Sequence, residues 1–171
     1  ASPGFGVSGV AALHRGLIRL DGPDALPFLP GLTTNATPLL ENDQTQCQYT
    51  SVLHPKGAAL LAGCVHHPCG QRARDCLAAL LAGRVLWEMF VWSRQGTVLL
   101  DCDGTATAAI QKRLRTFLLR ANVEISDATA EWAAYSVQSW AAADLPAEAA
   151  AVLDPRCNAL GYRALAPVGS L

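Results

Sequence analysis

One acidic side chain stands out among the residues that could do chemistry. Glu88 lies in the segment RVLWEMFVW, residues 84–92, and every other residue from 85 to 92 is apolar. The pattern predicts a strand that is covered on both faces, and a carboxylate buried there needs a partner or its pKa rises. Two interpretations stay open: Glu88 is paired with a nearby arginine or lies near the strand end, or it points into a ligand pocket and accepts the N–H groups of a ring.

Two cations are further candidates for contact with a ligand. Arg120 ends a helical pattern in FLLRANV, where it is either a solvated cation at a helix C-terminus or an anion contact in a cleft. Lys56 lies in the turn sequence HPKG. The sequence contains no G-x-S-x-G, no H-E-x-x-H and no phosphate-binding glycine loop. These residues alone predict a ligand-binding α+β domain rather than a particular enzyme class.

Residues 58–82 interrupt the pattern. The segment is alanine-rich, ALLAG occurs at both of its ends, and its removal would join HPKG almost directly to GRVLWEMF. We interpret it as an insertion, either a surface excursion with a short helix or a translated intron. Its Cys64, His66 and Cys69 are weak candidates for a metal site, because the paired C-x-x-C form is missing and adjacent histidines rarely bind one ion. The alternative, which we favour, is a flexible loop without a metal.

Composition narrows the class of protein. The 171 residues are 51% hydrophobic and 16% charged, which suits one domain with its own core, or a domain with part of a second. A net charge of −1 argues against nucleic-acid binding, and no apolar run reaches the roughly 18 residues of a membrane span. Six cysteines in such a chain favour reduced thiols in the cytosol or a matrix compartment. The acid-free residues 1–15 predict a transit-peptide remnant or a flexible terminus.

The expected elements alternate between strands and helices. Gly22 or Asp21 caps a first helix with Pro23 at its first position, and Pro27 keeps that helix short. A second helix, capped by Asp103 or Thr105, occupies DGTATAAIQKRLRTFLLR. Strands are expected at 16–21, 47–54, 84–92, 97–103, 122–127, 132–140 and after the turn that begins at 154. This order predicts an α+β domain over 16–165, with two main helices on an antiparallel or mixed sheet, and a short end at 166–171.

Read in order, six pieces of the chain resemble a known family. They are LDGPDALPFLPGLTTNAT, YTSVLHPKG, GRVLWEMFVW, LLDCD, FLLRANVEI and LDPRCNALGYRALAP. The series is similar to the N-terminal part of the YgfZ/GcvT-type folate-binding family, whose members include aminomethyltransferases and iron–sulfur cluster assembly factors. The segment DPR…LGYR favours the mitochondrial iron–sulfur branch. The resemblance implies the N-terminal part of the aminomethyltransferase fold and a channel for tetrahydrofolate.

Within that resemblance, individual positions acquire roles. The family's T-T-N loop lies beside the folate channel, which would place Thr34 and Asn35 there as short polar side chains that line it. Glu88 falls where relatives often have aspartate and would face a pterin-like ring, while Lys56 and Arg120 complete the implied folate contacts. Two departures matter: Ala36 replaces a usual acidic residue, and the family's K-G-C-Y-x-G-Q-E motif does not occur in these 171 residues.

Three functions follow from the resemblance. The first is a factor of the mitochondrial matrix that works with iron–sulfur assembly proteins to mature [4Fe–4S] proteins and binds tetrahydrofolate without turnover. The second is an aminomethyltransferase of the glycine cleavage system, an enzyme. The third is a truncated product without function, which the missing motif favours. No catalytic residue is assigned, and neither nucleic acid nor membrane insertion is expected.

Overall fold

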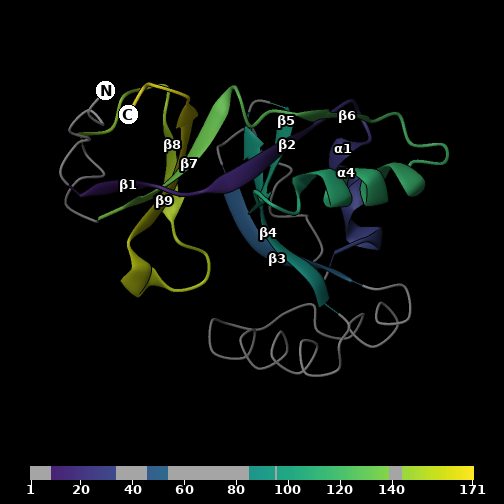
Figure 1. The fold of residues 1–171 in the computed structure, drawn as a ribbon, viewed down its shortest axis with the longest axis horizontal. Coiled ribbons are helices and arrows are strands. Elements are labelled where there is room, and N and C mark those ends of the chain that lie inside the picture. Colours follow the sequence, from purple (N-terminus) through teal and green to yellow (C-terminus); the bar gives the residue numbers. More distant parts are fainter. Residues whose placement is uncertain (1–8, 34–45, 54–84, 95, 139–143) are drawn as a thin grey trace.

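The computed structural model describes residues 9–33, 46–53, 85–94, 96–138 and 144–171, and the strands in these ranges form two antiparallel sheets (Figure 1). The large sheet has the order β3-β4-β5-β2-β6, and the small sheet has the order β1-β7-β9-β8. The strands are β1 (Val10–Ala12), β2 (Arg15–Asp21), β3 (Gln46–Leu53), β4 (Val85–Arg94), β5 (Thr97–Asp103), β6 (Glu124–Asp127), β7 (Trp132–Val137), β8 (Ala150–Leu153) and β9 (Tyr162–Pro167). The helices are α1 (Ala25–Phe28), α4 (Thr107–Thr116) and the 3-10 turns η1 (Leu29–Gly31) and η4 (Asn158–Leu160).

The large sheet is the middle layer of the fold. In Figure 1 the small sheet lies on one side of it and helices α1 and α4 lie on the other. Met89 and Val91 of β4 belong to the core on the helix side, whereas Phe90 and Trp92 belong to the core between the two sheets. Alternate residues of a strand point to opposite faces, so β4 is buried from both sides. The predicted covered strand is therefore confirmed, and so is the α+β class.

Several boundaries differ from the sequence prediction. Helix α4 begins at Thr107, four residues after Asp103, because the Asp103 carboxylate accepts hydrogen bonds from the amide and hydroxyl of Thr105 in a turn before the helix. Neither residue caps the helix. Helix α1 begins at Ala25 and ends after one turn, and a 3-10 turn follows at Leu29. The prolines at 23, 27 and 30 account for this irregular course.

Two strands were not predicted. Strand β1 lies within residues 1–15, a segment predicted to be flexible, and it pairs with β7 through Val10 opposite Val137. Strand β8 begins with two alanines among its four residues and pairs with β9. Alanine has a low strand propensity, so this element is formed by its sheet neighbours rather than by local preference. None of the helices in the described ranges is long and apolar enough to cross a membrane.

A glycine on β2 allows the chain to pass close to the start of α4. A Cβ atom built on Gly16 would lie 1.8 Å from the Thr107 Oγ1 atom, far inside van der Waals contact. The Thr107 hydroxyl contacts the carbonyl oxygens of Gly104 at 3.1 Å and Asp103 at 3.3 Å. Backbone and helix therefore fit together at this point because residue 16 has no side chain.

Candidate functional site

The structure separates the two predicted ligand contacts that it describes. Glu88 is exposed, faces the same side of β4 as Phe90, and pairs in register with Ser51. Arg120 is also exposed but follows α4, which covers the opposite face of the large sheet. Thr34, Asn35 and Lys56 lie outside the described residues, as do Cys64, His66 and Cys69.

Burial of Glu88 was the basis of its prediction, and the structure corrects this point. The side chain lies where β4 leaves the inter-sheet core, so it remains in solvent although its neighbours Met89 and Phe90 are buried. A position near the end of the covered part of the strand was one of the two readings left open. The hydrogen bond to Asp154 and the charge of that carboxylate raise the pKa of Arg156, and the negative charge of Glu88 adds to the same shift.

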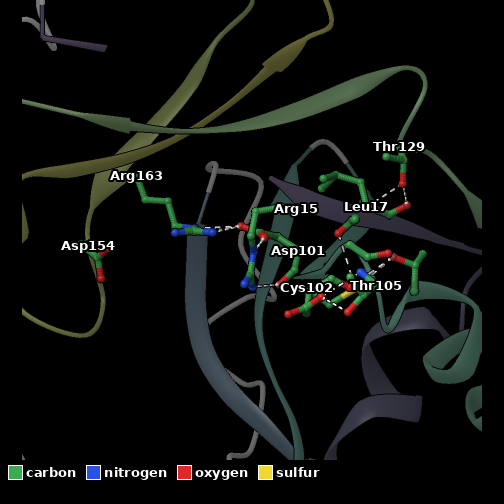
Figure 2. A network of polar contacts seen from close by, with 12 residues as sticks. Arg15, Leu17, Asp101, Cys102, Thr105, Thr129, Asp154 and Arg163 are labelled. Atoms are coloured by element: carbon green, nitrogen blue, oxygen red, sulfur yellow. Dashed lines mark hydrogen bonds and ion pairs between the residues drawn. The ribbon is translucent and has the colours of Figure 1, made fainter. Parts of the chain in front are cut away.

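A buried carboxylate does exist, one strand away. Asp101 of β5 is fully buried and accepts a hydrogen bond from Arg15 Nε at 2.6 Å and one from Arg163 Nε at 2.7 Å (Figure 2). Arg15 comes from β2 of the large sheet, whereas Arg163 comes from β9 of the small sheet and is only 4% exposed. The carboxylate therefore neutralises two arginines at the junction of the two sheets.

Phe90 lies at the centre of the same group. The guanidinium carbon of Arg163 lies 3.7 Å from the ring centroid, that of Arg156 5.1 Å and that of Arg15 5.8 Å. A cation above an aromatic face is attracted by the ring quadrupole, and the attraction is strongest where water is excluded. We call Arg15, Phe90, Asp101, Asp154, Arg156 and Arg163 the Asp101 cluster.

Asp154 and Arg156 form the outer part of the Asp101 cluster. The Asp154 carboxylate accepts hydrogen bonds from Arg156 Nε at 2.9 Å and Nη2 at 2.7 Å, and its Oδ1 also accepts one from the Arg156 amide at 3.0 Å. Burial by itself would raise the pKa of Asp154, but the hydrogen bonds and charge of Arg156 outweigh it and lower that pKa. The pair is therefore ionised at neutral pH, with Arg156 half open to solvent.

The chemistry of the Asp101 cluster is that of binding and positioning. Its two carboxylates accept hydrogen bonds from its arginines, so neither acid is free to act as a general base. Cys47 on neighbouring β3 is no nucleophile either, because burial raises the pKa of its thiol well above the ordinary value. Across the ranges that the structure describes, no three histidine, cysteine or acidic side chains gather as metal ligands.

Sequence reasoning missed this cluster although a signal was present. Asp101 lies in TVLLDCD between apolar residues, the same pattern that drew attention to Glu88. Its partners are 86 and 62 residues away, at Arg15 and Arg163, and no local spacing connects them. Arg163 lies in the LGYR segment that carried the family resemblance, where its role was not assigned.

Two cysteines allow a direct test of burial. Cys102 is fully buried, its thiol contacts the Gly16 carbonyl oxygen at 3.5 Å, and burial raises its pKa to about 11. Cys157 is exposed. We expect iodoacetamide at pH 8 to modify Cys157 in the folded protein and to leave Cys102 unmodified, since the thiolate is the reactive form. Peptide mass spectrometry measures both, with guanidinium-unfolded protein as the control; equal labelling of the two in folded protein would contradict the structure.

Comparison with known proteins tests the family resemblance predicted from the sequence. The chain is 34% identical over 164 residues to the human mitochondrial iron–sulfur cluster assembly factor IBA57, a match that covers 88% of this chain. The chain is a homologue of this assembly factor. The mouse protein of the same name is 30% identical over 167 residues, and the homologue from Mycosarcoma maydis is 26% identical over 159 residues. All three relatives are mitochondrial proteins by name. No family model matches the chain.

The fold comparison agrees with the sequence relatives. The structure superposes on the glycine cleavage system aminomethyltransferase T from Bartonella henselae with a TM-score of 0.57 and 14% sequence identity, over 91% of this chain and 40% of that one. At this identity the likeness concerns the fold, and it confirms the predicted aminomethyltransferase-type architecture. The chain spans 40% of the length of the human and mouse IBA57 proteins.

Proposed function

We propose that the protein is an iron–sulfur cluster assembly factor that supports the maturation of [4Fe–4S] proteins in the mitochondrial matrix, together with other assembly proteins. The observation that carries the proposal is the 34% identity to human IBA57 along 88% of the chain. In this fold the Asp101 cluster joins the two sheets, because one carboxylate accepts hydrogen bonds from an arginine of each sheet. In this proposal the iron–sulfur cluster itself is carried by the assembly proteins as a group.

Genetic replacement tests this function. Cells depleted of their own IBA57 are expected to lose aconitase activity and protein lipoylation, two products of [4Fe–4S] maturation. Expression of the full-length gene of this protein, targeted to mitochondria, should restore both. The control is a full-length gene with a stop codon placed early in the reading frame. Restoration of the growth rate without aconitase or lipoylation would argue against an assembly role.

Tetrahydrofolate is the proposed ligand, with Glu88 as a contact. An exposed carboxylate on the β4 face supports the fit, because the amino and ring N–H groups of a pterin suit a carboxylate acceptor. Thr34, Asn35 and Lys56 stay predicted contacts of the same ligand. Arg120 also stays a predicted contact, although it follows α4, which packs on the helix side of the large sheet.

The Glu88→Gln variant measures that contact. We expect it to weaken tetrahydrofolate binding by about tenfold or more, which corresponds to the loss of one charged hydrogen bond. Anaerobic isothermal titration gives the Kd of each protein. The matched control is Glu124→Gln, which neutralises another exposed strand carboxylate at the far edge of the large sheet. Equal loss in both variants would remove Glu88 from the site, and no binding by the parent protein would end the folate proposal.

The shared fold keeps an aminomethyltransferase as the second candidate. Such an enzyme releases ammonia from an aminomethyl-lipoyl carrier protein and transfers the one-carbon unit to tetrahydrofolate. The purified protein would then turn over this substrate, whereas an assembly factor would bind tetrahydrofolate without ammonia release. Measured ammonia release at a rate that scales with protein concentration would favour the enzyme.

A further inference from the structure

The segment between α4 and β6 lies at the outer end of the helix layer (Figure 1) and combines two unusual features. The first is charge. Lys112, Arg113, Arg115 and Arg120 lie within nine residues, and helix α4 contains no acidic residue. The rest of the chain has nine basic and fourteen acidic residues. Positive charge is therefore concentrated in this segment of a protein whose net charge is −1.

Three of these cations are exposed side chains. Lys112 and Arg120 are exposed, and neither makes an ion pair in the part of the chain that the structure describes. Arg115 is exposed and donates to the Ile125 carbonyl oxygen at 3.1 Å rather than to a carboxylate. The helix dipole favours cations in the last turn of α4, but Arg120 lies four residues beyond that turn.

The second feature is a strained and exposed leucine. Leu119 is 93% exposed and has a φ of +35°, a backbone conformation that favours glycine or asparagine. It lies in a turn closed by a hydrogen bond from the Ala121 amide to the Leu118 carbonyl oxygen at 2.6 Å. A large apolar side chain is thus held out into water in a conformation that costs stability, and such strain concentrates at functional positions.

We propose that Lys112, Arg115, Leu119 and Arg120 form a docking surface for an acidic partner protein, with Leu119 as the apolar anchor. An apolar side chain that fills a pocket, surrounded by charges that steer the encounter, is the usual anatomy of a small interface. The proposal does not depend on the proposed folate contact of Glu88, which lies on the other face of the large sheet. It adds a surface to the proposed assembly function.

The same residues fit other macromolecules less well. Binding to an anionic membrane needs an apolar helix face, but Ile110 and Leu114 of α4 are buried in the helix-side core. Single-stranded nucleic acid needs aromatic platforms, whereas Phe117 is partly buried and covered by Arg113 at 5.2 Å. A protein surface with acidic side chains around an apolar pocket matches both features.

Site-directed photo-crosslinking identifies the partner. A benzophenone amino acid at Thr116, which is exposed one turn before Leu119, is activated in the full-length protein in isolated mitochondria, and the adducts are identified by mass spectrometry. We expect an adduct with an acidic protein. A cross-link within the same polypeptide, or adducts without any acidic protein, would overturn the proposal.

Binding to the identified, purified partner then supplies the decisive comparison. Leu119→Asn should raise the Kd about tenfold or more without lowering Tm, because asparagine tolerates the positive φ and the Leu119 side chain is 93% exposed. Lys112→Glu with Arg120→Glu should slow association at least tenfold at low salt. Val168→Asn, at another exposed apolar residue on the distant small sheet, is the control and should change neither quantity. Unchanged binding by Leu119→Asn, or binding to anionic vesicles that this variant abolishes, would overturn the proposal.

Discussion

Replacing Asp101 by asparagine is expected to lower the free energy of unfolding by about 3 to 5 kcal/mol, the usual cost of removing one partner from a buried ion pair. Asp101 is fully buried, and the substitution leaves Arg163, which is 4% exposed, without its counter-charge between the two sheets. Because the two arginines come from different sheets, the loss acts on their junction. Urea unfolding followed by tryptophan fluorescence measures the change.

An exposed ion pair in the same protein provides the matched control. Arg19 Nη2 lies 2.6 Å from Glu131 Oε2, and the Glu131 side chain is 57% exposed. Glu131→Gln should change stability by less than about 1 kcal/mol, since solvent screens exposed pairs. Similar losses in the two variants would show that the Asp101 cluster is not the electrostatic link between the sheets.

Replacing Gly16 by alanine is expected to cost about 3 kcal/mol, at the upper end of the usual range for overpacking. The new methyl group would lie 1.8 Å from the Thr107 Oγ1 atom, so the hydroxyl must rotate away from its carbonyl partners. Thr107 Cβ at 3.1 Å and Gly104 Cα at 3.3 Å would still be tight contacts. Thermal unfolding by circular dichroism measures the loss. A shift of Tm by several degrees is the expected result for a chain of this length.

Two further variants isolate the contact. Gly104→Ala meets only ordinary contacts of 3.6 Å, to Arg15, Gly16 and His14, and should be nearly neutral. The double variant Gly16→Ala with Thr107→Ala removes the clashing hydroxyl and should be more stable than Gly16→Ala alone. If it is less stable than the single variant by the full cost of Thr107→Ala, the two positions do not interact and the close approach is wrong.

The local pattern of apolar and polar residues was sufficient to predict the strands in which that pattern is strong. The alternation in 84–92 predicted the doubly covered β4, and β5 has the predicted bounds, Thr97–Asp103. The division of the strands between two sheets was not predicted, because it depends on pairings such as β1 with β7, more than 120 residues apart. Local preference says nothing about such partners.

The candidate site was predicted less well than the fold, for a related reason. Glu88 was recognised because it interrupts an apolar run, but its exposure depends on where the small sheet ends above β4. The Asp101 cluster brings together residues of β2, β4, β5 and β9, and of the loop between β8 and β9. A site made by such distant contacts becomes visible once the sheets are placed.

The N-terminal strands have a consequence for synthesis of the protein in the cell. Strands β1 and β2 follow one another within residues 10–21, yet β1 pairs with β7 and β2 pairs with β5 and β6. At a translation rate of about 5 to 20 residues per second, Val10 waits roughly 6 to 25 seconds before Val137 has been made. The apolar Leu17, Ile18 and Leu20 of β2 wait a shorter time, about 4 to 16 seconds, until their neighbours around Leu100 of β5 have been made. The nascent chain is therefore a natural client for chaperones that shield exposed strands until the partner strands emerge.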